Sequence, residues 1–239
     1  MLENIKRQVQ GFTYLLSHPV QLRHVVMRET RYRQRHRSKQ DWVEWQKYDT
    51  HSSAPQHSTT KAYARPINVA RILIFSELVS GVGTGLRILD VGCGDGVISE
   101  PMSRMGNHVT SVDLPTITIL AQKRRVSSVV AGDAEHLAFA PASFDMVLAS
   151  EVLEHLWDPH GFFDEAYRVL KTEGYLIIET PEGEEGLRYD SHKNYFTVDI
   201  LKQMGGAKFG LREVKRLKPA GVPTHTIIVL LHKSKRANE

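Results

Sequence analysis

The chain has 239 residues, of which 41% are hydrophobic and 24% are charged, with a net charge of +4. This composition excludes wholesale disorder, and the length suits one α/β domain with an appendage better than two enzyme domains. The single cysteine, Cys93, excludes an intramolecular disulfide, and no apolar stretch reaches the roughly 20 residues of a membrane span. We therefore expect a cytoplasmic protein.

The positive charge is concentrated near the N-terminus. Residues 1–47 contain ten Lys or Arg and four acids, a net charge of +6, so the remaining chain carries −2. Apolar residues at helical spacing predict two amphipathic helices there, and residues 49–60 have the polar composition of a linker. We expect a basic helical extension over 1–60 and a catalytic domain over 61–239. The extension is interpreted as a solvated helix face, a lid over the acceptor, or a contact to an anionic lipid or membrane surface, with nucleic acid a less favoured partner.

From Pro66 the pattern alternates between helix and strand, beginning with a helix that ends at Gly81. Strands are predicted at Arg87–Val91, His108–Val112, Ser128–Val130, Met146–Ala149, Tyr175–Glu179, Arg212–Leu217 and Thr226–Leu231, and further helices at Val97–Met105, 115–124, 160–170 and 197–204. This order predicts a three-layer α/β fold, with helices on both faces of a mainly parallel seven-stranded sheet. The short connection Lys218–Pro223 predicts a hairpin, which adds one antiparallel strand.

A glycine-rich segment, Asp90-Val91-Gly92-Cys93-Gly94-Asp95-Gly96, follows the first predicted strand. Glycines permit tight turns and let a ligand approach the backbone, and open α/β sheets bind ligands beyond the carboxyl ends of their strands. Val97 occupies the third glycine position of the pattern Gly-x-Gly-x-x-Gly, which disfavours an NAD-dependent dehydrogenase. The absence of a Gly-Lys-Ser/Thr sequence excludes a nucleotide triphosphate P-loop.

Several motifs, in their order and spacing, resemble the class I S-adenosylmethionine-dependent methyltransferases from about Pro66 to the C-terminus. They are Ile88–Gly96, Val112-Asp113 at the end of the second strand, Gly132-Asp133-Ala134 after the third, Phe144–Val147 leading into Glu151–Leu156, and Leu170–Gly174 before the fifth strand. The last departs from the family's Leu-Lys-Pro-Gly-Gly turn, because Thr172 and Glu173 replace Pro and Gly. The resemblance implies a Rossmann-like methyltransferase fold with S-adenosyl-L-methionine as cofactor.

The resemblance also implies roles for individual residues. Asp113 would accept both ribose hydroxyls, Asp133 the adenine amino group, and the N–H of Ala134 would donate to the ring. Asp90 and the Gly92 backbone would face the methionine part of the cofactor, whose ammonium favours a nearby anion. Cys93 is interpreted as a small packing residue. The complete predicted cofactor site comprises Asp90, Gly92, Cys93, Gly94, Asp113, Leu114, Asp133, Ala134 and Glu151.

The acceptor side is expected after the fourth and fifth strands. Glu151, Glu154 and His155 follow the fourth strand as Glu-x-x-Glu-His, and His192 follows the fifth. This set is similar to that of the O-methyltransferases of ubiquinone biosynthesis and of enzymes that methylate the terminal ribose of small RNAs with a divalent metal. Two hypotheses follow. Either His155, His192 and Glu151 are catalytic without a metal, or all four residues bind a divalent metal that lowers the pKa of an acceptor hydroxyl.

The sequence therefore predicts an S-adenosylmethionine-dependent methyltransferase that methylates an oxygen of a small-molecule or lipid-linked acceptor. Three alternatives stay open: an N-methyltransferase, metal-dependent methylation of a ribose hydroxyl of RNA, and a cofactor-binding protein without catalysis. Association with a membrane surface through the basic extension would place a cytoplasmic enzyme at the membrane periphery.

Overall fold

The computed structural model describes residues 38–40, 66–115, 128–184, 187, 192–218 and 225–234. The chain divides into two compact units, Met1–Trp45 and Gln46–Glu239. Apart from residues 38–40, the predicted N-terminal extension lies outside the described residues, as do the linker at 49–60 and nearly all of the helix predicted at 115–124. The predicted boundary near residue 60 stays a prediction.

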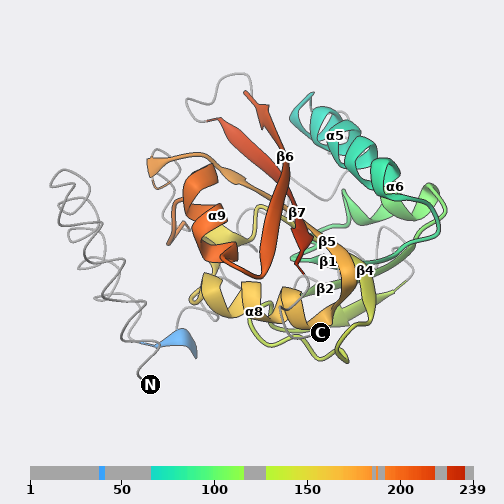
Figure 1. The fold of residues 1–239 in the computed structure, drawn as a ribbon, viewed down its shortest axis with the longest axis horizontal. Helices are drawn as coiled ribbons and strands as arrows, with labels where there is room; N and C mark the ends of the chain where they lie inside the picture. The colour runs from blue at the N-terminus through green and yellow to red at the C-terminus, as the bar shows by residue number, and fades with distance from the viewer. Residues whose placement is uncertain are drawn as a thin grey trace, which may run out of the picture. The chain divides into compact units, whose positions relative to one another are not determined.

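Seven strands of the described chain form one sheet in the order β3-β2-β1-β4-β5-β7-β6 (Figure 1). They are β1 (Arg87–Val91), β2 (His108–Asp113), β3 (Val129–Ala131), β4 (Phe144–Ser150), β5 (Leu170–Pro181), β6 (Phe209–Leu217) and β7 (Thr226–Lys233). Strands β1 to β5 are parallel, whereas β7 lies between β5 and β6 and is antiparallel to both. The predicted sheet, with its single antiparallel strand and terminal hairpin, is confirmed.

The largest difference from prediction is in β5, which begins at Leu170 rather than at Tyr175, and β6 begins at Phe209 rather than at Arg212. Leu170 pairs with Phe144, and the register then shifts between Phe144 and Met146. Glu173 has a φ of 62°, so the residues predicted as a turn form an irregularity within the strand. The motif, in which Thr172 and Glu173 replace Pro and Gly, therefore lies within the strand, next to the register shift.

The described helices of this unit are α5 (Pro66–Val82), α6 (Ser99–Arg104), α8 (Pro159–Val169) and α9 (Val198–Gly205), with a short 3-10 helix, η2 (Leu153–His155). Side-chain caps set two of the starts: Asp158 accepts from the N–H of His160 at α8, and Thr197 accepts from the N–H of Ile200 at α9. The four α-helices lie within two residues of their predicted bounds. Within the described residues, no helix has both the length and the apolar character needed to cross a membrane.

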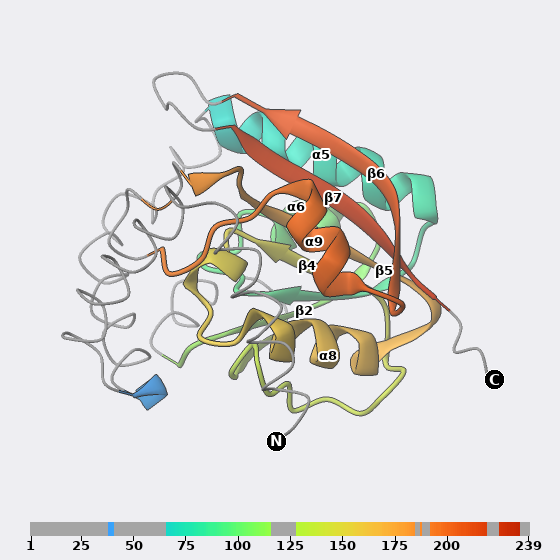
Figure 2. The same ribbon diagram turned by 60° about the vertical axis from the view of Figure 1, so that its left-hand side comes forward.

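The helices form two layers, one on each face of the sheet. Successive strand residues point to opposite faces, so Ile88 joins the cluster of Phe75 and Met102 from α5 and α6, while Leu89 joins the cluster of Phe162 from α8. Figure 2 shows α5 and α8 on opposite sides of the strands. The predicted three-layer arrangement is therefore confirmed.

Parallel pairing brings the carboxyl ends of β1 to β5 to one edge of the sheet. The chain runs from β1 outward to β2 and β3, and then returns to β4 on the other side of β1. Such a reversal of strand order is where open α/β sheets bind their ligands. The segments that begin at Gly92, Asp113, Gly132 and Glu151 meet at this edge, and the candidate site is built from them.

Candidate active site

The loop after β1 has three glycines with positive φ, and two of them shape the site. Gly92 has a φ of 69°, and a Cβ at this position would lie 2.3 Å from Cγ2 of Val152. Gly94 has a φ of 55°, and no atom of the described residues lies within 4 Å of the position that its Cβ would take. Only glycine suits the first position, because of both conformation and space. The second leaves the backbone open to an approaching ligand.

Asp113 connects this loop to the end of β2. Its Oδ2 accepts a hydrogen bond from the N–H of Gly94 at 2.7 Å, and its Oδ1 accepts one from the N–H of Leu114, also at 2.7 Å. Burial raises the pKa of Asp113 to about 6, although these two hydrogen bonds act to lower it. A carboxylate has about four acceptor positions, so two remain for ligand hydroxyls.

Asp90 lies beneath the glycine loop and is 1% exposed. It accepts a hydrogen bond from the hydroxyl of Ser99 at the start of α6, and Ser99 in turn accepts one from Ser111 at 2.8 Å. Burial raises the pKa of Asp90 to about 7, and the hydrogen bond from Ser99 lowers it. Burial also raises the pKa of the neighbouring Cys93 thiol, which agrees with a packing residue rather than a thiolate nucleophile.

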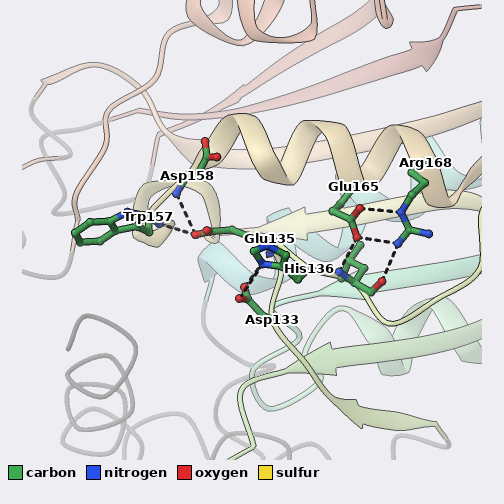
Figure 3. Close-up of polar contacts among 8 residues, drawn as sticks. Asp133, Glu135, His136, Trp157, Asp158, Glu165 and Arg168 are labelled. Atoms are coloured by element: carbon green, nitrogen blue, oxygen red, sulfur yellow. Dashed lines mark hydrogen bonds and ion pairs between the residues drawn. The ribbon is translucent and has the colours of Figure 1, made fainter. Parts of the chain in front are cut away.

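The loop after β3 carries Asp133, Ala134 and Glu135 (Figure 3). Oδ1 of Asp133 accepts from the N–H of Glu135 at 2.9 Å, while the Asp133 side chain remains 39% exposed. Ala134 packs against the edge of the core. Glu135 is buried, and its Oε1 accepts from the N–H groups of Trp157 and Asp158 at 2.7 and 3.0 Å. Asp133 and Ala134 are therefore held at the strand end with an accessible carboxylate.

Glu151, the first residue after β4, is half-buried and belongs to an ion-pair network with Arg71 and Glu179. Its φ is 56°, a left-handed conformation that is uncommon for residues other than glycine. Its Oε1 lies 3.3 Å from Nη2 of Arg71 on α5, and Nε of Arg71 donates to Oε1 of Glu179 at 2.6 Å. Burial raises the pKa of Glu151, nearby Glu154 raises it further, and the Arg71 guanidinium lowers it.

Arg71 and Glu179 were not identified from the sequence. Glu179 is fully buried and ends the apolar run Leu176–Ile178 of β5. Like Asp113, Glu179 is an acid that follows an apolar run in a strand, and this signal could have found it. Arg71 carries no such signal, because its partners lie about 80 and 108 residues away.

Glu154, His155 and His192 form a compact group whose ligand atoms all lie within 4.8 Å of one another. The two imidazole rings meet edge to face, with centroids 4.9 Å apart. Oε2 of Glu154 accepts from Thr180 at 3.0 Å, whereas the buried Oε1 has no hydrogen-bond partner among the described residues. Burial raises the pKa of Glu154 to about 8. Three residues of the predicted metal set thus come together, and Glu151 lies instead against Arg71.

Four hydrogen bonds connect residues 192–194 to η2 and to Leu156, which follows it. Two backbone N–H groups of this segment donate to the carbonyl of Glu154, at 2.6 and 3.1 Å. The side-chain amide of Asn194 donates to the carbonyls of Leu153 and Leu156, at 3.1 and 2.8 Å. These bonds fix the position of a histidine that follows β5 against one that follows β4.

The fold is the one found in solved methyltransferase structures. Residues 89–178 match a sequence family described as a methyltransferase domain. Among solved structures, the chain is similar to the 1,6-didemethyltoxoflavin-N1-methyltransferase of Burkholderia thailandensis, with a TM-score of 0.65 and 20% identity over 83% of this chain and 91% of the other. That structure contains bound S-adenosylhomocysteine, and at this identity the likeness establishes the fold.

Sequence relatives confirm the narrower resemblance to ubiquinone biosynthesis O-methyltransferases. The relative from Xylella fastidiosa is 37% identical over 121 residues, which are 48% of each chain. The relative from Maricaulis maris is 42% identical over 103 residues, covering 40% of this chain and 41% of the other. The chain therefore matches about half the length of these curated relatives.

Proposed function

We propose that this protein is an S-adenosylmethionine-dependent methyltransferase that methylates a hydroxyl oxygen of a small-molecule or lipid-linked acceptor. The observation that carries the proposal is the strand-end arrangement itself. The open Gly94 backbone and the half-buried Asp113 carboxylate lie at the reversal of strand order, and the Glu154, His155 and His192 group follows the neighbouring strands. The names of the sequence relatives support O-methylation.

The residues present suit the proposed cofactor. Asp113 would bind the ribose hydroxyls, beside Leu114, and the exposed Asp133 carboxylate with the Ala134 N–H would bind adenine. The Gly92–Gly94 backbone would lie along the methionine part of the cofactor. Asp90 would act indirectly, through the hydrogen bond that it accepts from Ser99. S-adenosylmethionine supplies a methyl group already activated on a sulfonium, so the new O–C bond forms as the C–S bond breaks.

Acceptor activation is assigned to the histidine pair. A hydroxyl must lose its proton as its oxygen is methylated, and an imidazole titrates near neutrality. In the absence of a metal, the general base would be His155 or His192, whose rings meet edge to face. Glu151, whose carboxylate lies 3.3 Å from the Arg71 guanidinium, would orient the acceptor.

A divalent metal at Glu154, His155 and His192 is the second part of the proposal. The specific observation is Oε1 of Glu154, which is buried without a hydrogen-bond partner in the described part of the chain and lies in a cluster of possible ligands. One carboxylate and two imidazoles are a common donor set for first-row metals. A cation there would compensate the buried carboxylate and lower the pKa of a bound hydroxyl.

Methyl transfer to a panel of probe acceptors tests both parts. We expect S-adenosylhomocysteine to form with dihydroxybenzene probes, with and without a prenyl chain, and not with amines or RNA. Exhaustive chelation is expected to lower turnover at least about tenfold, and added divalent metal to restore it. Mass spectrometry of the product and a coupled assay for S-adenosylhomocysteine measure these outcomes.

The outcomes separate the alternatives. Full turnover after chelation would reject the metal and leave a histidine base. Methylation of amines alone would indicate an N-methyltransferase, and methylation of RNA alone would indicate the ribose-modifying alternative. Cofactor binding with no turnover on any probe would support a non-catalytic protein. Glu154→Gln provides the matched variant, since it retains the shape of the side chain and is expected to abolish the response to added metal.

The proposals on the binding partner and the location of the protein rest on the charge of residues 1–47, which is net +6. We propose that this segment attracts an anionic membrane surface and brings a cytoplasmic enzyme to lipid-linked acceptors. Each basic residue near such a surface contributes about 1 kcal/mol, and salt screens the attraction. We expect the full chain to sediment with vesicles containing phosphatidylserine and to be released by salt. Equal sedimentation with neutral vesicles would contradict this proposal.

A further inference from the structure

Glu135 occupies an unusual position between the two sides of the proposed site. Its carboxylate is buried, yet Oε1 accepts two backbone hydrogen bonds from another segment, at 2.7 Å from the N–H of Trp157 and 3.0 Å from that of Asp158. Hydrogen bonds to a carboxylate are shorter and about twice as strong as neutral ones. Figure 3 shows the Glu135 side chain reaching from its loop to this turn. The carboxylate therefore joins two segments about 22 residues apart in sequence.

The loop that carries Glu135 is itself firmly held. Asp133 accepts from the backbone N–H of Glu135, so the proposed adenine ligand and Glu135 share one short turn. Further along, the N–H of Leu137 donates to Glu165 on α8 at 2.7 Å. Arg168 pairs with Glu165 and donates to the carbonyl of Leu137 at 2.7 Å (Figure 3). The cofactor side of the connection is thus rigid.

The other end of the connection leads to the acceptor side. Trp157 lies two residues after His155, and Asp158 caps the start of α8. The ammonium of Lys193 lies 3.4 Å from the centroid of the Trp157 ring, and Lys193 follows His192 directly. The Trp157 turn is therefore attached to both segments that carry the histidine pair.

We propose that Glu135 is a positioning residue that couples the cofactor loop to the acceptor segments. This inference rests on the proposed function. Glu135 touches neither reactant. Its carboxylate fixes the position of the Trp157 turn relative to Asp133. The histidine pair therefore keeps its position relative to the bound cofactor. A misplacement of about 1 Å at a reacting centre can cost about 100-fold in rate.

The test compares three substitutions at this position. Glu135→Ala removes the acceptor, Glu135→Asp keeps the charge but withdraws it by one methylene, and Glu135→Gln keeps the length and one acceptor oxygen. We expect Ala and Asp to lower kcat by about 10- to 100-fold while the Kd for S-adenosylhomocysteine changes less than about threefold. Gln is expected to retain most of the activity. Exchange of the Trp157 and Asp158 amide protons, measured by NMR, is expected to quicken in Ala and Asp.

Glu165→Gln is the matched control, because Glu165 holds the same loop through Leu137 and its hydrogen bonds within the described residues go to Leu137 and Arg168. It is expected to leave amide exchange at residues 157 and 158 unchanged. The inference is overturned if Asp retains full kcat, or if Kd rises by the same factor as kcat falls. If Ala does not fold, the contrast between Asp and Gln decides. Failure of the wild-type protein to bind S-adenosylhomocysteine would instead reject the proposed function, while the exchange comparison still tests the connection.

Discussion

Replacing Asp113 with Ala is expected to weaken the binding of S-adenosylmethionine and S-adenosylhomocysteine by about 100-fold or more. The substitution removes the hydrogen bonds between the carboxylate and the ribose, each worth about 1.5–3 kcal/mol when one partner is charged. The same change removes the acceptor for the N–H groups of Gly94 and Leu114, at 2.7 Å each, so the glycine loop also loses its attachment to β2. Calorimetric titration of the wild-type protein and of Asp113→Ala with the two sulfur nucleosides and with NAD measures the effect.

The pH dependence of binding provides an internal control. Because the pKa of Asp113 is raised to about 6, the carboxylate becomes protonated as the pH falls through that value and loses acceptor capacity. Wild-type affinity is therefore expected to decline below about pH 6, and Asp113→Asn to show a flatter profile. Undiminished binding by the Ala variant would remove Asp113 from the cofactor site. Binding of NAD alone would overturn the methyltransferase proposal.

Local patterns were sufficient to predict the strands and the glycine loop. The run Arg87–Val91 is apolar and β-branched and is followed by closely spaced glycines, and β1 has these same bounds. Helix periodicity similarly predicted α5 to within one residue. These features depend on neighbouring residues, whose preferences the sequence displays directly.

The internal geometry of the site depends on distant residues and was only partly predictable. The order of strands indicated that His155 and His192 would share one sheet edge, and the rings do meet. The amide of Asn194, which clamps the two segments, bonds carbonyls about 40 residues away and has no local pattern. Glu151 was expected among the metal ligands, but it pairs with Arg71 and lies outside the group of Glu154, His155 and His192. Side-chain contacts that depend on tertiary packing produce no periodic pattern in the sequence.

Arg71→Met is expected to lower the free energy of unfolding by about 3–5 kcal/mol, because it leaves a buried carboxylate without its cation. Glu179 is fully buried, and its Oε1 lies 2.6 Å from Nε of Arg71. Ser150 would still donate to the other oxygen, which does not neutralise the charge. Methionine has a similar length to the arginine stem, so lost packing contributes little. Urea unfolding followed by circular dichroism measures the difference.

Two companion variants identify the cause of the loss. Arg216→Met breaks an exposed pair with Glu182, at 2.8 Å, and is expected to change stability little, since surface ion pairs contribute little. Arg71→Met combined with Glu179→Gln removes the uncompensated charge and is expected to recover a substantial part of the stability. If the single Arg71 variant is no less stable than Arg216→Met, the network does not hold α5 to the ends of β4 and β5. Recovery in the double variant would show that the uncompensated charge of Glu179 causes the loss of stability.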